Sequence, residues 1–431
     1  MINLEQYSGK RICVAVSGGR DSMALLHYFY GNAEKFGIKL SAVNCDHKIR
    51  GESSLSDSRF VAGFCRERSI PLKFFEWNGD AVKTENSARI WRRECYRTAL
   101  KPDSDGGWDG ADMIATAHHM GDNAETVLFN LARGSALAGM TGITDCESES
   151  GLKIVRPFIG ISRSRIEEYV KENSVPYVDD ETNFTDAYTR NKIRHNVLPE
   201  LYKAVPGAER AIFRFSRLAA EDERYFEDLI ENRGIIKNTP FGVEISLCEP
   251  AVFKRAAVKA VAGIFKRKDY TSLHAESLFN LTRCAVGKKF EFLSLVAYRE
   301  ENAVGIAEKN GLEGYCIPYN EYSGCDFCGR LLKFSPSPSQ GKTLKFDAAK
   351  IPAGAVIRFM RNGDVFKKFG GGTKNLGDFF TDRKIPARIR KQLPLIADGN
   401  EVYLVAGIEI SDKIKVTKDT KNVLYAESDK I

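Results

Sequence analysis

Arg11-Ile-Cys-Val-Ala-Val16 runs directly into Ser17-Gly18-Gly19-Arg20-Asp21-Ser22 and then into Met23-Ala-Leu-Leu-His-Tyr-Phe29. The first run is apolar and β-branched, the last has apolar residues at helical spacing, and two glycines lie between them. This order predicts a strand, a tight loop and a helix. Glycine allows positive φ and close approach to an anion, toward which the first N–H groups of the following helix point. The stretch therefore predicts a phosphate-binding loop.

The side chains of this loop narrow its chemistry. Ser17 and Ser22 add hydroxyl donors, whereas Asp21 fits a phosphate site only beside Mg²⁺ or an incoming cation. The loop lacks the Gly-Lys-Ser/Thr ending of a Walker A motif, which disfavours γ-phosphate transfer of the kinase type. The alternative is an ordinary strand-to-helix turn in which Ser and Asp act as helix caps.

The composition is that of a globular protein with more than one domain. The chain has 431 residues, of which 43% are hydrophobic and 28% charged. We see no signal peptide and no apolar run that could span a bilayer, and we expect a cytoplasmic protein without membrane association. The 10 cysteines follow no disulfide framework and fit reduced thiols.

Positive charge is concentrated in two zones. Residues 358–391 hold ten basic and three acidic residues, and residues 190–217 hold seven basic and two acidic residues. On a chain with a net charge of only +7, these zones suggest a polyanion larger than ATP, most simply RNA. Solvated surface charge is the alternative.

Strand and helix signals alternate through the first half of the chain. Repeated strand–helix units predict a doubly wound, parallel, Rossmann-like sheet, with ligands bound beyond the carboxyl ends of its strands. We expect this catalytic domain at 1–215, a mainly helical middle domain at 216–330, and a small α+β domain at 341–431. The region 315–345 is rich in Gly, Pro and Ser and reads as a linker.

Polar residues follow the expected strands. Asp46-His-Lys-Ile-Arg50 closes the second strand, and His118-His119 follows a later one. Asp122 and Glu125 are three residues apart, so they share one helical face and can hold an ammonium group. A capping box with Asp122 as N-cap and Glu125 at N3 explains the same pair without a ligand.

Arginines occur in two further helical segments. Arg89, Arg92 and Arg93 lie at helical spacing with Tyr96, where solvated helix charge is the default interpretation. Between residues 179 and 199, acids and amides mix with cations that are apt for phosphate contacts.

Taken in order, these segments resemble the tRNA(Ile)-lysidine synthetases of the PP-loop ATP pyrophosphatase superfamily. The resemblance is carried by 17–22, 46–50, 85–96, 117–126, 133–134, 156–157, 180–199, 361–364, 384–388 and 394–398. It implies ATP-dependent adenylylation of C2 of the wobble cytidine in a tRNA(Ile) with a CAU anticodon, releasing pyrophosphate. L-lysine then displaces AMP to form lysidine. A homodimer is compatible with the sequence.

The resemblance also implies roles for individual residues. The catalytic residues would be Asp21, Asp46, His118 and Arg92. ATP would be bound by Ser17, Gly18, Gly19, Arg20, Asp21 and Ser22, and Asp21 would also hold Mg²⁺. Lysine would be bound by Asp122 and Glu125, and phosphate or tRNA by Arg190, Arg194, Arg361, Lys384 and Arg388. Two departures stand out. Gly121 replaces an acid that the family usually carries, and Arg92-Arg93 replaces an Arg-Tyr pair, which leaves Arg89 or Arg92 for that role.

Two alternatives remain. A tRNA thiolase activates a base in the same way but uses sulfur, and Cys325-Asp-Phe-Cys328 with Cys316 is the feature that favours it. A single CxxC in such a segment is weak support for metal or sulfur chemistry. A non-catalytic RNA-binding protein is the second alternative, and the intact loop at 17–22 argues against it.

Overall fold

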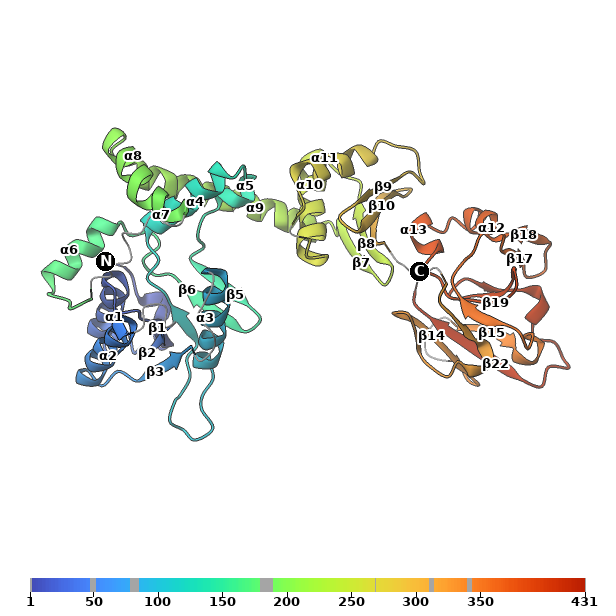
Figure 1. The fold of residues 1–431 in the computed structure, drawn as a ribbon, viewed down its shortest axis with the longest axis horizontal. Coiled ribbons are helices and arrows are strands. Elements are labelled where there is room, and N and C mark those ends of the chain that lie inside the picture. Colours follow the sequence, from blue (N-terminus) through green and yellow to red (C-terminus); the bar gives the residue numbers. More distant parts are fainter. Residues whose placement is uncertain are drawn as a thin grey trace. The chain divides into compact units, whose positions relative to one another are not determined.

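The computed structural model describes residues 2–46, 52–77, 85–178, 189–267, 269–309, 314–338 and 343–430. The polar segment 47–50 and most of the predicted loop, 179–188, lie outside the described residues. The chain forms two compact units, Met1–Arg224 and Tyr225–Ile431, and the boundary falls inside helix α9 (Ala208–Asn232). Figure 1 shows the helices and strands of both units.

Unit 1 is built on one six-stranded sheet in the order β3-β2-β1-β4-β6-β5. Its strands are β1 (Arg11–Ala15), β2 (Lys39–Asp46), β3 (Leu72–Glu76), β4 (Met113–Ala115), β5 (Cys146–Glu149) and β6 (Leu152–Val155). All pairings are parallel except that of β5 with β6. The prediction of a parallel α/β catalytic domain is confirmed. Because the strand order reverses beside β1, the carboxyl ends of β1 and β4 open onto one crevice.

Helices alternate with these strands. They are α1 (Arg20–Asn32), α2 (Glu52–Glu67), α3 (Glu85–Leu100), α4 (Met120–Ala132), α5 (Leu137–Met140), α6 (Arg163–Glu172), α7 (Thr189–Lys192), the π-helical η3 (Ile193–Val197), α8 (Leu198–Ala204) and α9. Two of them begin at the crevice, because α1 follows β1 directly and α4 follows β4 after a short loop.

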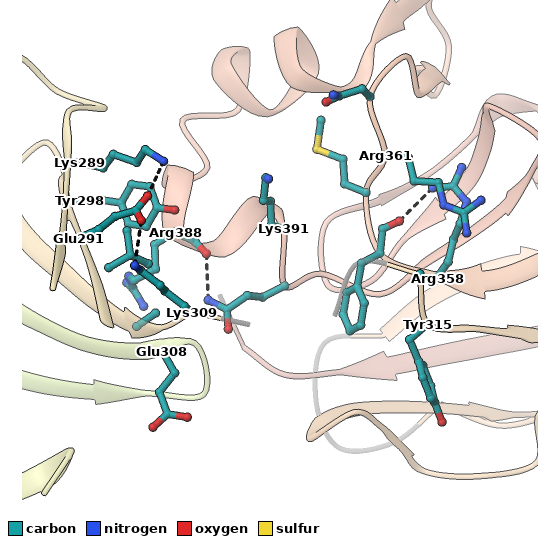
Figure 2. A pocket seen from close by; sticks show the side chains of 17 residues that line it. Lys289, Glu291, Tyr298, Glu308, Lys309, Tyr315, Arg358, Arg361, Arg388 and Lys391 are labelled. Carbon is teal, nitrogen blue, oxygen red and sulfur yellow. Dashed lines mark hydrogen bonds and ion pairs between the residues drawn. The ribbon is translucent and has the colours of Figure 1, made fainter. Parts of the chain in front are cut away.

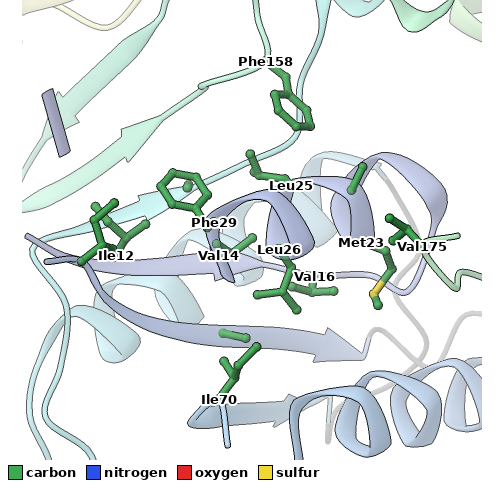
Figure 3. Packing of buried hydrophobic residues seen from close by; sticks show 14 of the residues in the cluster. Ile12, Val14, Val16, Met23, Leu25, Leu26, Phe29, Ile70, Phe158 and Val175 are labelled. Atoms are coloured by element: carbon green, nitrogen blue, oxygen red, sulfur yellow. The ribbon is translucent and has the colours of Figure 1, made fainter. Parts of the chain in front are cut away.

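The two faces of the sheet carry separate cores, as the alternation of side chains along β1 requires. Ile12 and Val14 pack on one face against α1, including Phe29, with α2 and α6 completing that layer (Figure 3). Cys13, between them, points to the opposite face and packs with Tyr96 of α3. The phosphate loop is thus held between β1 and α1, whose facing side chains are buried.

The middle of the chain differs from the prediction. Residues 236–308 form a five-stranded antiparallel sheet in the order β7-β8-β11-β10-β9, with three helical segments packed on it, so a mainly helical domain was wrong. The elements are β7 (Ile236–Thr239), β8 (Gly242–Ser246), α10 (Pro250–Val258), η4 (Lys259–Ile264), α11 (Ser272–Leu281), β9 (Lys289–Phe292), β10 (Leu295–Arg299) and β11 (Ala303–Glu308). These strands are only four to six residues long, which makes them weak periodic signals.

The C-terminal part of unit 2 is also mostly sheet. Seven strands form one sheet: β12 (Cys316–Pro318), β16 (Val356–Arg358), β17 (Val365–Lys367), β18 (Thr373–Asn375), β19 (Leu395–Asp398), β20 (Glu401–Val405) and β21 (Glu409–Ile410). Four form another: β13 (Asp326–Phe327), β14 (Arg330–Ser335), β15 (Thr343–Asp347) and β22 (Val423–Ser428). Two short helices, α12 (Leu376–Asp382) and α13 (Ala387–Arg390), accompany them.

The segment read as a linker is part of this body. β12 pairs with β16, and β14 pairs with β22, so residues 316–335 are held by strands beyond residue 355. The boundary that the sequence placed between 330 and 341 therefore falls within a set of paired strands. Pro and Ser residues had obscured strands whose partners lie far along the chain.

A buried ion pair fixes the centre of the seven-stranded sheet. Arg358 donates to both carboxylate oxygens of Asp364 at 2.8 and 2.7 Å, and both side chains are almost completely buried. The Arg361 backbone N–H also donates to Oδ2 of Asp364 at 2.8 Å, the oxygen that Nη1 of Arg358 contacts.

We expect Asp364→Ala to destabilise unit 2 by about 3–5 kcal/mol, because it leaves the Arg358 charge buried without its partner. All 3 tryptophans, at 77, 91 and 108, lie in unit 1. In urea, the circular dichroism transition should therefore move to lower concentration while the tryptophan transition stays in place. The exposed Asp419→Ala is the control, and a coincident shift of both transitions would contradict the assignment.

No helix among the described residues is both long enough and apolar enough to cross a membrane.

Candidate active site

The loop after β1 closes on itself through its two serines. The Ser22 hydroxyl donates to the Gly19 carbonyl at 2.9 Å and accepts from the Ser17 N–H at 3.2 Å, and the two hydroxyls are 3.2 Å apart. Gly18 has φ +89°, a conformation that favours glycine. Gly19 is the N-cap of α1 and has no side chain to cap the first amides of the helix. These N–H groups are thus available to an anion, as predicted.

The charged residues of the loop have different surroundings. Arg20 forms ion pairs with Glu167 of α6 at 2.7 Å and with Asp21 at 3.5 Å. The Asp21 carboxylate also lies 3.7 Å from Nε2 of His119. Arg20 is therefore engaged with α6, whereas Asp21 faces the start of α4 across the crevice.

Helix α4 begins with a cap that the sequence had placed three residues later. His119 is the N-cap: its Nδ1 accepts from the Gly121 N–H at 3.0 Å, and its own N–H donates to Asp122 at 3.0 Å. A capping box exists, but with Asp122 at N3 rather than as N-cap. Glu125 takes no part in it, so capping does not account for that carboxylate.

Asp122 and Glu125 together bind one cationic group, which is a side chain of the same protein. Arg194 of η3 donates from Nε to Glu125 and from Nη2 to Asp122, both at 2.8 Å. The side chains of Asp122 and Glu125 are 19% and 9% exposed, and that of Arg194 is 36% exposed. The spacing of the two acids thus suits one cationic group, which here is the Arg194 guanidinium.

The two acids have shifted pKa values of opposite sign. Burial raises the pKa of Glu125, and Arg194 only partly offsets this rise. Burial would also raise the pKa of Asp122, but His119 and Arg194 outweigh it and leave the pKa below its ordinary value. Such a divided pair is typical of sites that bind charge and move protons.

The adjacent histidine, His118, lies just beyond the carboxyl end of β4, where the same crevice opens. Its Nδ1 lies 3.0 Å from the Thr116 hydroxyl, at the end of β4. Loss of hydration lowers the pKa of His118 to about 4, opposed by Asp122 and assisted by Arg156 and Arg92. The imidazole is consequently neutral near pH 7. Asp46 is buried at the carboxyl end of β2, the strand beside β1.

The structure separates the two arginines of α3. Arg93 is paired with Glu147 and Glu149 of β5, so it stabilises the sheet edge. Arg92 is exposed and acts electrostatically on His118. Of the two, Arg92 is the one whose charge influences His118. Arg190, on α7, stacks over Phe129 of α4 at 5.1 Å and also acts on Glu125.

Two of the three basic residues predicted for tRNA in unit 2 line a cavity of about 530 Å³ (Figure 2). Arg361 and Arg388 line it together with Lys391 and with Lys289 and Lys309, which flank Glu291. Arg361 is exposed, and so is Lys384, which lies outside the lining.

Arg388 is the exception among them. It is fully buried and donates to Glu300 at 2.9 Å and Glu244 at 2.6 Å, and also to the Phe241 carbonyl. The predicted contact of Arg388 with tRNA is therefore replaced by a structural bridge between α13 and the five-stranded sheet.

Sequence comparisons identify the family. Residues 2–201 match the PP-loop domain, and residues 355–426 match the TilS substrate C-terminal domain. A tRNA(Ile)-lysidine synthase of Thermotoga maritima is 40% identical over 430 residues, which cover 94% of this chain and 92% of that protein. One from Caldanaerobacter subterraneus subsp. tengcongensis is 32% identical over 459 residues, covering 97% and 93%. The chain belongs to the tRNA(Ile)-lysidine synthase family.

Among solved structures, the U34-tRNA thiolase NcsA of Methanococcus maripaludis matches at 18% identity with a TM-score of 0.42, covering 49% of this chain and 73% of that chain. A likeness of this degree does not bear on the choice between lysidine synthase and thiolase. In the part of the chain that the structure describes, no group of three or more His, Cys, Asp or Glu side chains is placed to hold a metal ion. Cys316, Cys325 and Cys328 therefore form no cluster site.

The same finding bears on Mg²⁺. Mg²⁺ is usually bound by one or two carboxylates together with substrate phosphates rather than by a complete protein cage. A lone Asp21 beside an anion-binding helix start fits that pattern. Asp21 is the residue that would hold the ion, which would supply charge neutralisation on the polyphosphate.

Sequence reasoning missed the part that His119 plays and gave Arg194 a different one. His119 had no predicted role, yet it links Asp21 to Asp122. Arg194 was assigned to phosphate or RNA, but its guanidinium lies on the acid pair. The backbone does mark Arg194, because π-helical turns such as η3 often occur at functional positions. This mark cannot be read from the sequence.

Proposed function

We propose that this enzyme joins L-lysine to C2 of the wobble cytidine in a tRNA(Ile) with a CAU anticodon, converting ATP to AMP and pyrophosphate. The observation that carries the proposal is the meeting of two sites at one sheet edge. An anion-binding loop follows β1, and a buried acid pair that already holds a guanidinium follows β4, with Asp21, His119 and Asp122 in a chain between them.

The first step is transfer of AMP to the base. The C2 oxygen of cytidine attacks the α-phosphorus, the bond to the β-phosphate breaks, and pyrophosphate leaves. Residues 17–22 bind the departing pyrophosphate through helix N–H groups and hydroxyls. Asp21 would hold Mg²⁺, which would neutralise part of the negative charge on the pyrophosphate. We assign Arg92, whose charge influences His118, to the adenylate. An anticodon-loop base reaches such a crevice because it can be splayed out of its stack.

The second step replaces AMP by lysine. The ε-amine, after losing a proton, forms a bond to C2, and the C2–O bond breaks with departure of AMP. Asp122 and Glu125 bind the ammonium of the incoming lysine. Since Arg194 binds both carboxylates at 2.8 Å, it gives up at least one of them when lysine enters. Its partial exposure leaves room for that movement.

The test uses the full chain with ATP, Mg²⁺, labelled lysine and a deacylated tRNA(Ile) bearing CAU. We expect pyrophosphate release and incorporation of label, both lost when the wobble cytidine is replaced. Pyrophosphate release with no lysine incorporation would contradict the proposal. Transfer of sulfur from a sulfide donor under those conditions would identify a thiolase instead.

Exposed cations of unit 2 are expected to contribute phosphate contacts. Arg361→Gln and Lys384→Gln should each weaken tRNA binding uniformly across tRNA sequences and reduce the slope of log affinity against log salt by about 1. Filter binding at several salt concentrations measures both effects. Lys333→Gln, an exposed lysine on β14, is the control. Unchanged slopes in both variants would remove these residues from the tRNA-binding surface.

A further inference from the structure

Three carboxylates surround His119, and only two of them belong to the predicted site. Nε2 of His119 is 3.7 Å from Asp21 and 3.6 Å from Asp122. The third is Glu209, in the first turn of α9, 88 residues further along the chain than Gly121. Neither motif searching nor helical spacing connects Glu209 with α4.

The space beside Gly121 brings Glu209 and His119 together. A Cβ atom at Gly121 would lie 2.8 Å from Cε1 of the His119 ring and 3.3 Å from Oε1 of Glu209. The imidazole and the carboxylate therefore border one small volume. A side chain at position 121 would collide with the ring, so glycine is what permits this arrangement.

The imidazole is held in a defined tautomer. Because its Nδ1 accepts from the Gly121 N–H, the hydrogen of the neutral ring is on Nε2, which faces Asp21 and Asp122. The Cε1 edge of the ring faces the volume that Glu209 borders. Rotation of the ring would break the cap of α4 and turn Nε2 away from the phosphate loop.

Glu209 is itself anchored at the site. The backbone N–H of Arg163, at the start of α6, favours the charged form of this carboxylate and so lowers the pKa of Glu209. Burial raises the pKa of Glu209, and His119 is the largest influence opposing that rise. Glu209 and His119 thus border the same volume and influence each other electrostatically across it.

We propose that Glu209 is a positioning residue of the active site, which holds the His119 imidazole from the side left open by Gly121 and so keeps Nε2 directed at Asp21. This rests on the proposed function for its kinetic consequence. Glu209 does not touch ATP, lysine or cytidine in the proposal; it acts through His119.

The kinetic test compares Glu209→Gln with Glu221→Gln, an exposed glutamate on the same helix. Glutamine keeps the size and the acceptor for Arg163 but removes the charge. We expect Glu209→Gln to lower kcat for tRNA-dependent pyrophosphate release about tenfold, with KM for ATP and lysine and the melting temperature unchanged, because misorientation costs rate rather than binding. Glu209→Asp should recover part of the loss, and Glu221→Gln should match the wild type.

A double-mutant cycle tests the route through His119. Gly121→Ala displaces the ring, and combining it with Glu209→Gln should lower the rate no further than the more severe single change. Additive losses, or a Glu209→Gln rate equal to that of Glu221→Gln, would overturn the proposal. A fall in rate matched by a fall in melting temperature would also overturn it, since Glu209 would then be only structural.

A readout independent of activity is the ¹⁵N spectrum of the histidine side chains in the full chain, with His119→Gln used for assignment. We expect a single Nε2–H tautomer for His119 in the wild type and a mixture in Glu209→Gln. An unchanged spectrum would contradict the positioning role. If the wild type released no pyrophosphate, the proposed function would fail, whereas this spectrum would still decide the role of Glu209.

Discussion

Replacing Asp21 with alanine is expected to lower the rate of tRNA-dependent pyrophosphate release about a thousandfold. Removing one group that stabilises the charge developing in a transition state typically lowers a rate by this factor. Asp21 is the loop carboxylate that faces His119, and it is the residue that would hold Mg²⁺ against the phosphates. Stopped-time assays of pyrophosphate with saturating ATP and tRNA measure the effect.

Two further variants make that result specific. Asp21→Asn keeps the shape of the side chain and should be almost as inactive, because charge rather than volume is lost. Asp109→Ala, at an exposed loop position, should behave as the wild type. If Asp21→Asn kept most of the activity, Asp21 would have no role in binding Mg²⁺ or phosphate.

Replacing Glu125 with glutamine is expected to raise KM for lysine about 30- to 100-fold, the loss of a charge-assisted contact of about 2–3 kcal/mol. The Glu125 carboxylate is the more buried of the two acids, so water screens its attraction for a cation less. Pyrophosphate release measured without lysine should be unchanged, since the adenylylation step precedes lysine attack. Initial rates of labelled lysine incorporation across a lysine series measure KM.

Glu200→Gln provides the matched control. Glu200, on α8, pairs with Lys203 at the surface, where both side chains are more than two-thirds exposed at 71% and 73%, and such pairs contribute little. A wild-type lysine requirement in Glu125→Gln would place the lysine site elsewhere. A loss of pyrophosphate release in the same variant would instead assign Glu125 to the first step.

Local sequence was sufficient for the catalytic fold. The glycines at 18 and 19, between an apolar strand and an apolar helix face, predicted the phosphate loop, and regular alternation predicted the parallel sheet. Both signals are local: strand period, helix period and turn residues lie within a few positions of one another. The acid pair was also predictable, because residues three apart share a helix face whatever the rest of the chain does.

Pairings between distant segments were not predictable in this way. The short strands at 236–246 and 289–308 are held by neighbours rather than by their own pattern, so helical signals at 250–281 dominated the prediction. Arg388 belongs to a basic run and reads as a surface cation, yet Glu244 and Glu300 enclose it. Charge count alone does not reveal which cations have buried partners.

The amino-acid sequence by itself determined the phosphate loop, the parallel sheet behind it, the carboxylates at 122 and 125, and, through the ordered set of motifs, the family. Only the tertiary structure decided that Arg194 occupies those carboxylates, that Arg93 is paired with β5 whereas Arg92 acts on His118, and that Glu209 borders the same volume as His119. The physical reason is range. Backbone conformation follows from neighbours in sequence, whereas the partner of a charged side chain is set by which distant segments the fold brings within a few ångströms.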